Sequence, residues 1–208
     1  MKSPPPATSP TAKGPRTKPA EVRLDELMNA AEALFLAHGV EATTINDIVA
    51  RCQVAKGTFY HYFASKTDIL DALARRYTGQ FLQRLEDAVN ACAPQDWSAR
   101  LRAWVHANVI TYLDTYVTHD IVYANHHHHN RLNADRNAIL EQLQGIIAGG
   151  VTDGVWQPAD ARVVALLIYS GVHGATDELI CDRQIDPRGF ADAVADACLN
   201  MLSPATST

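Results

Sequence analysis

Residues 42–66 of this 208-residue chain read ATTINDIVARCQVAKGTFYHYFASK. Thr44 and Asp47 have the spacing of a capping box, in which a hydroxyl accepts a backbone N–H and an acid three positions later reaches back. We therefore expect a short helix over residues 44–52, followed by a turn that opens a third, aromatic helix ending near Phe63. Two short helices joined by a turn make a helix-turn-helix.

The flanking sequence is also helical in pattern. Upstream, apolar residues recur at three- and four-residue steps from Leu24 to Phe35, and Gly39 is placed to end that helix. Downstream, Ser65 and Asp68 repeat the capping layout. The same spacing of apolar residues predicts helices over residues 65–89 and 97–116 and a short helix from Thr118. It also predicts a helix from Asn133 that stops at Gly149-Gly150, one from Pro158 to Ile180 and one from Pro187 to Met201. Nine helices without any period-two alternation predict an all-α fold.

The composition is that of an ordinary globular protein, with 47% hydrophobic and 20% charged residues. The longest apolar run, residues 163–169, is far short of the roughly 18 residues of a membrane span, so no membrane partner is expected. The proline-rich first twenty residues lack the apolar core of a secretory signal, which predicts a cytoplasmic protein.

Charge is unevenly distributed along the chain, whose net charge is −5. Residues 1–20 carry four basic groups and no acid, residues 21–75 carry five basic and eight acidic groups, and the rest carries nine and fifteen. Phosphates would be attracted by the basic arm and repelled by the acidic remainder. Any contact with nucleic acid is therefore expected from the N-terminal third.

Residues 42–49, 54–63 and 65–66 together resemble the N-terminal signature of the TetR family of transcriptional regulators, and the resemblance covers about residues 25–73. It implies a three-helix DNA-binding domain (21–66) and a larger helical ligand-binding and dimerisation domain (67–203). The proline-rich residues 1–20 are expected to form a disordered basic arm, and the small polar residues 204–208 a tail. The implied function is that of a repressor that binds palindromic operator DNA as a homodimer and is released by a small-molecule inducer. Activation instead of repression remains open.

The resemblance also implies which residues contact DNA. These are Thr44, Ala55, Lys56, Gly57, Thr58, Tyr60, His61 and Lys66. The residues that open the third helix would read base edges, while the phenol, imidazole and ammonium groups would contact phosphates. The alternative is structural: Thr44 as a cap only and Lys56 as a solvated side chain. Phe59 and Phe63 are expected in the core.

Two positions depart from the family pattern. Gln53 stands where glycine is usual, at a cost of about 1 kcal/mol if its φ is positive. Ala55 stands where serine or threonine is usual, which removes a hydroxyl able to cap the helix or touch DNA.

The C-terminal part is expected to dimerise through residues 160–180 and 187–202, where Ser170, Gly171, Gly174 and Ala175 allow close helix approach. Trp104, Asn108 and Tyr112 combine apolar surface with polar groups on one helix and are the candidate ligand-binding residues. The alternative is that the aromatic residues of this region fill the core.

Two other functions are open. A metal-responsive regulator would use His119 with the run His126–His129, of which only His126 and His129 share a helix face; the alternative is a solvated polar segment. A DNA-free helical adaptor would leave Lys56, Tyr60 and Lys66 without consequence. The chain has no Glu-x-x-His, no G-x-S-x-G and no phosphate-binding glycine loop, so neither catalysis nor a cofactor is expected.

Overall fold

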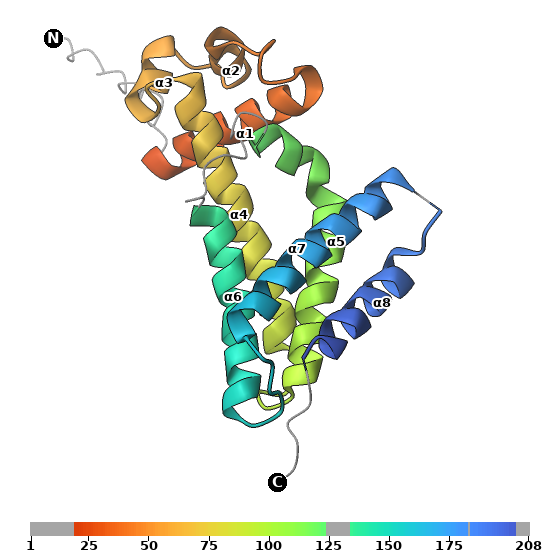
Figure 1. Cartoon of the computed structure of the whole chain (residues 1–208). Coiled ribbons are helices and arrows are strands. Elements are labelled where there is room, and N and C mark those ends of the chain that lie inside the picture. The colour runs from red at the N-terminus through yellow and green to blue at the C-terminus, as the bar shows by residue number, and fades with distance from the viewer. Residues whose placement is uncertain (1–18, 124–133, 183, 203–208) are drawn as a thin grey trace, which may run out of the picture.

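The computed structural model describes residues 19–123, 134–182 and 184–202. These residues form eight helices (Figure 1): α1 Ala20–His38, α2 Ile45–Arg51, α3 Lys56–Tyr62, α4 Lys66–Asn90, α5 Trp97–Tyr123, α6 Ala134–Thr152, α7 Ala161–Cys181 and α8 Pro187–Asn200. The all-α prediction is confirmed. The separate helix expected at Thr118 is wrong, because no glycine or proline interrupts residues 97–123 and α5 continues to Tyr123.

Helices α1 to α3 pack around Phe35, Ile48 and Phe59, each of which is fully buried. Gly39 ends α1 as predicted: its φ is +82°, and its N–H donates to the carbonyl of Phe35 at 2.8 Å. Gln53 lies in the turn between α2 and α3 with a φ of +54°, so the condition under which it costs more than glycine is met. The predicted helix-turn-helix is therefore present.

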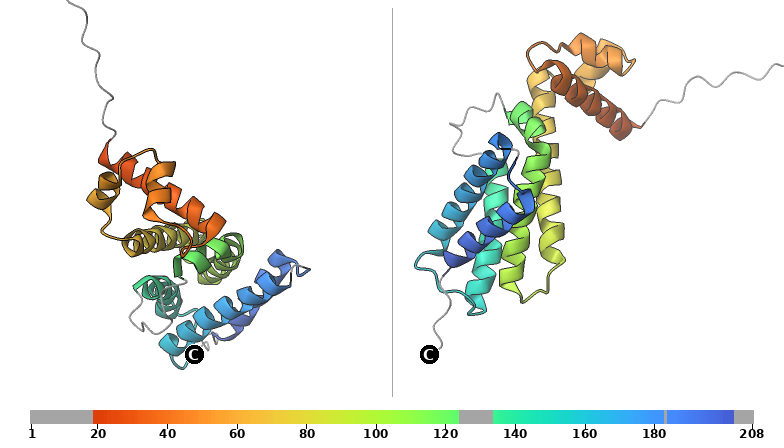
Figure 2. Two further views of the ribbon diagram at one scale, coloured as in Figure 1. Left: turned by 90° about the horizontal axis from the view of Figure 1, so that it is seen from above. Right: turned by 90° about the vertical axis from the view of Figure 1, so that its right-hand side faces the viewer.

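Helix α4 runs unbroken from the α1–α3 domain into the C-terminal bundle (Figure 2, right). The hydroxyl of Ser65 caps it by accepting the N–H of Asp68 at 3.1 Å. In the bundle, α5 contacts α4, α6, α7 and α8 and forms its centre. A shift of α4 against α5 would therefore reach both domains.

Helix α6 does not stop at Gly149-Gly150 as expected but continues to Thr152. The two glycines instead accommodate indole rings. A Cβ built on Gly149 would lie 2.1 Å from the ring of Trp97, and one on Gly150 would lie 2.2 Å from the ring of Trp156. Close packing of helix backbone against tryptophan explains glycine at both positions.

Helix α7 begins at Ala161 rather than at Pro158, because the side chain of Asp160 caps it by accepting the N–H groups of Arg162 and Val163. It exposes a row of large apolar side chains: Val163 is 49% exposed, Leu166 40% and Leu167 52%. By length and composition α7 is also the one described helix apolar enough to cross a membrane. One such helix is weak grounds for a membrane span, and its contacts with α5, α6 and α8 place it in the bundle.

Candidate nucleic-acid interface

The start of α2 is an exposed, fully formed capping box. Thr44 accepts the N–H of Asp47 at 3.2 Å on its hydroxyl oxygen, and the Asp47 carboxylate accepts the N–H of Thr44 at 2.9 Å and its hydroxyl at 2.6 Å. The hydrogen bonds from the Thr44 side chain and backbone lower the pKa of Asp47 below its usual value. The capping role predicted for Thr44 is confirmed, and its contact with DNA stays a prediction.

Helix α3 divides its side chains between the core and solvent. Phe59 is fully buried and Phe63 is 6% exposed, which confirms the core role expected of both. Tyr60 is 50% exposed, and Lys56 and His61 are also exposed. The remaining candidates in this helix are Gly57, which is exposed, and Thr58, which is half-buried. The helix therefore presents a cation, a phenol and an imidazole on its outer surface.

Ala55 precedes α3 as its N-cap and makes no side-chain capping hydrogen bond. The N–H of Thr58 in the first turn instead donates to the backbone carbonyl of Ala55 at 2.9 Å.

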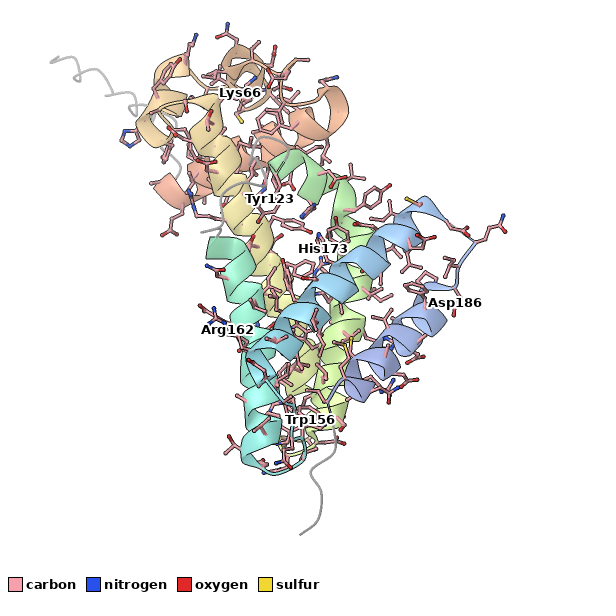
Figure 3. The ribbon with its side chains drawn as sticks, viewed as in Figure 1. Lys66, Tyr123, Trp156, Arg162, His173 and Asp186 are labelled. Atoms are coloured by element: carbon pink, nitrogen blue, oxygen red, sulfur yellow. The ribbon has the colours of Figure 1, made fainter. Side chains whose placement is uncertain are left out.

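Lys66 (Figure 3) is hydrogen-bonded within the protein, whereas Lys56, the other lysine of the candidate interface, is exposed. Its ammonium donates to the carbonyls of Val40 at 2.6 Å and Thr43 at 3.1 Å, both in the segment between α1 and α2. It therefore ties α4 to the start of the helix-turn-helix. Its contact with a phosphate stays a prediction, and these two carbonyls assign Lys66 a positioning role.

The sequence did not predict one contact between the two domains. Arg76 of α4 donates to the side chains of Asn29 at 2.8 Å and Glu32 at 2.6 Å in α1. Its partners lie 47 and 44 positions away, and periodicity within one helix carries no signal for such a contact.

The three ligand-binding candidates lie inside the bundle. Trp104 is fully buried and donates its indole N–H to Gln142 at 3.0 Å, while Asn108 and Tyr112 are each 6% exposed. Burial, followed by the charges of Asp177 and Asp120, raises the pKa of Tyr112 above its usual value. The candidates therefore occupy the core, as the alternative held, yet Asn108 and Tyr112 place polar groups there.

An open depression of about 520 Å³ lies elsewhere, between α6 and the start of α7. Its lining includes Leu140, Glu141 and Arg162 but none of the three candidates, so it gives them no pocket.

Of the metal candidates His119, His126 and His129, only His119 lies within the described residues. His126 and His129 lie outside the described residues. Within the described ranges no three His, Cys, Asp or Glu side chains gather as metal ligands. His119, 25% exposed at its side chain, contacts Asp120 at 3.1 Å and packs among aromatic rings.

Comparisons with known proteins agree with this architecture. Residues 27–73 match the family described as bacterial regulatory proteins, tetR family. The transcriptional repressor KstR2 of Mycobacterium tuberculosis is 37% identical over 71 residues, which cover 34% of this chain and 36% of the repressor. The chain thus aligns with little more than a third of that relative's length.

Two further relatives extend over the C-terminal bundle. The fatty acid metabolism regulator protein of Bacillus subtilis is 24% identical over 82% of this chain and 91% of its own. A solved tetR-family regulatory protein from Rhodococcus RHA1 superposes with a TM-score of 0.68 at 23% identity, covering 88% of this chain and 98% of that one.

The fold and the matched segment define a helix-turn-helix regulatory protein of two helical domains. Residues 27–73 match the tetR family of bacterial regulatory proteins, and the chain shares the fold of a solved tetR-family regulator. Because the family consists of regulators, the expectation that the chain is not an enzyme agrees with it.

Proposed function

We propose that this protein is a transcriptional repressor that binds a palindromic operator as a homodimer and releases it when a small molecule binds in the α4–α8 domain. The observation that carries the proposal is the division of α3 and its C-cap, which bury Phe59 and Phe63 while Lys56, Tyr60 and His61 are exposed. Such a helix is anchored from behind and leaves cationic and hydrogen-bonding groups for the major groove and its phosphates. Operator DNA as partner also implies a cytoplasmic site of action.

Dimerisation supplies the second recognition helix. Two such helices must meet successive major grooves about 34–36 Å apart. The apolar row of Val163, Leu166 and Leu167 on α7 is the surface we assign to the partner subunit, together with the exposed Met201 after α8. Exposed apolar rows on neighbouring helices are typical of a buried helical interface between identical subunits.

Release requires a connection between the ligand and α3. Helix α4 is that connection, because it holds α1 through Arg76 and packs against α5 along the bundle. A ligand that favours the released arrangement by about 1–3 kcal/mol would change operator affinity 5- to 150-fold. The Bacillus subtilis relative is named as a regulator of fatty acid metabolism, which makes fatty acids one class of ligand to test.

The test begins with selection of genomic fragments by the purified protein, followed by anisotropy titration of the best fragment at several salt concentrations. Tyr60→Ala and Lys56→Ala are compared with wild type, and Arg84→Ala is the control, because Arg84 is a basic, exposed residue in the bundle part of α4 and lies outside the expected dimer interface. We expect a palindromic site with a steep salt dependence, weakened by both α3 substitutions and unchanged in the control. If no genomic fragment is enriched, or if the α3 variants bind DNA like wild type, a DNA-free adaptor is favoured instead.

A further inference from the structure

Six aromatic side chains from three helices meet in the bundle, and we refer to them as the ring cluster. They are Tyr77 of α4, Tyr112, His119 and Tyr123 of α5, and Tyr169 and His173 of α7. The ring centroids of Tyr112 lie 4.9 Å from those of both His119 and His173, and His119 lies 4.9 Å from Tyr123. Figure 3 shows Tyr123 and His173 in the part of the bundle nearest the α1–α3 domain.

Two buried polar groups beside these rings lack partners. Neither the carboxamide of Asn108 nor the hydroxyl of Tyr112 has a hydrogen bond within the described part of the chain, although each residue is only 6% exposed. The two residues are one turn apart and share a face of α5. A buried polar group without a partner costs free energy that an apolar residue of similar size would not.

The polar ends of Asn108 and Tyr112 are not sealed. Among the described residues, Arg100 Nε is the one fully occluded side-chain polar atom without a partner. The carboxamide and the hydroxyl are therefore not fully occluded. Polar groups that are buried and unpartnered without being fully occluded are what a ligand site requires.

The charges that act on Tyr112 are those of carboxylates, whereas Tyr77 also feels the guanidinium of Arg84. Neither α5 from residue 103 onward nor α7 from residue 163 onward contains a lysine or arginine, whereas Asp120 and Asp177 lie on these helices. Both carboxylates disfavour a negative charge on the hydroxyl of Tyr112. Of the basic groups on α4, Arg76 is bound to Glu32 and Arg84 is exposed.

We propose that the ring cluster and Asn108 form the effector site, and that the effector is an organic cation: an ammonium or related onium group attached to an aromatic ring. The faces of tyrosine rings attract such cations, and desolvation strengthens that attraction. The carboxamide of Asn108 would accept or donate one hydrogen bond to the same molecule. A fatty acid or acyl thioester of coenzyme A would instead bring negative charge towards Asp120 and Asp177, on stretches of α5 and α7 that carry no lysine or arginine. This inference rests on the proposed function for its regulatory consequence.

The test compares three probes of similar size that differ in charge. They are benzyltrimethylammonium, its uncharged isostere neopentylbenzene, and 3-phenylpropanoate. Binding is followed by tryptophan fluorescence, because Trp104 lies one turn before Asn108 on α5, and by the thermal midpoint. We expect the cation to bind roughly 3- to 30-fold more tightly than the uncharged isostere, and the anion to bind least. Equal affinity for cation and isostere, tighter binding of the anion, or no binding of the cation overturns the proposal.

Two variants connect binding to the site. Asn108→Leu removes the carboxamide at similar size, so we expect it to weaken binding of the cation and to raise the thermal midpoint of the unliganded protein by roughly 2–4 °C. Asn90→Leu makes the same change at an exposed residue of α4 and should leave cation affinity unchanged. A lowered midpoint in Asn108→Leu, with cooperative unfolding retained, would mean that the carboxamide is already satisfied and would contradict the site.

Operator binding by the unliganded wild type separates this inference from the proposed function. A protein that binds operator DNA but not the cation overturns the effector class alone. A protein that binds the cation but no operator keeps the site and overturns the proposed function.

Discussion

The guanidinium of Arg76 in α4 lies 2.6 Å from the carboxylate of Glu32 in α1. The next two residues of α4 face the other domain, since Tyr77 is hydrogen-bonded to Thr115 at 3.0 Å and Thr78 to Tyr123, both in α5. Three consecutive residues of one helix therefore hold the helix-turn-helix domain on one side and the bundle on the other. Movement at the ring cluster can reach α1 through a single turn of helix.

Substitution of Arg76 by glutamine should loosen the α1–α3 domain from α4 with little effect on overall stability. The ion pair is partly exposed, with side-chain exposures of 22% and 33%, so its loss should cost about 0–1 kcal/mol in the free energy of unfolding. Operator affinity should fall about 5-fold or more, because two recognition helices must hold one spacing at the same time. Anisotropy titration and thermal unfolding measure the two effects.

Arg75→Gln is the matched control for Arg76, because Arg75 is exposed on the same helix. Equal affinity losses in the two variants would mean that charge alone matters and that the contact with Glu32 does not.

Lys56 and Lys66 should behave differently although both are lysines of the candidate interface. Lys66→Met leaves the carbonyls of Val40 and Thr43 without their donor, so we expect a loss of about 1–3 kcal/mol in stability and an unchanged salt slope of operator binding. Lys56→Ala removes an exposed cation and should flatten the salt slope by about one unit with stability retained. A flattened salt slope in Lys66→Met would contradict this prediction and support the phosphate contact implied by the family resemblance.

Local signals in the sequence predicted the features that local interactions determine. The cap at Thr44, the cap at Ser65 and the end of α1 at Gly39 each depend on a few neighbouring residues, and all three are present. The bond of Lys66 to Val40 joins residues 26 positions apart, and no helical periodicity encodes it. The same limit explains the error at Gly149-Gly150, because the tryptophans that require glycine there come from outside the helix.

The four cysteines should differ in reactivity according to burial. Cys198 is 5% exposed, and burial raises the pKa of its thiol to about 11, so almost none of it is thiolate at pH 8. Cys181 is exposed. A disulfide reagent at pH 8 should therefore modify Cys181 rapidly and Cys198 only after denaturant is added, as peptide mapping by mass spectrometry would record. Because the pKa is raised, reaction of native Cys198 should increase only as the pH approaches 11; rapid reaction at pH 8 would contradict its burial.

Gly149 and Gly145 offer a matched pair within α6. A Cβ at position 149 would lie 2.1 to 2.6 Å from three atoms of the Trp97 ring, whereas nothing lies within 4 Å of one at position 145. The ring of Trp97 is also held by a hydrogen bond from its indole N–H to Asp153 at 2.7 Å, so it cannot move away without losing that bond. Gly149→Ala should therefore destabilise the protein by about 1–3 kcal/mol, the usual cost of overpacking.

Gly145→Ala should stabilise the protein by up to about 1 kcal/mol, because alanine is the better helix former and meets no neighbour. Urea unfolding of the two variants beside wild type measures both changes. Opposite signs would show that Trp97 packing, and not helix propensity, keeps glycine at position 149. Stabilisation by both substitutions would mean that the indole ring shifts freely, and that the contact between α5 and α6 at this end of the bundle is looser than the structure has it.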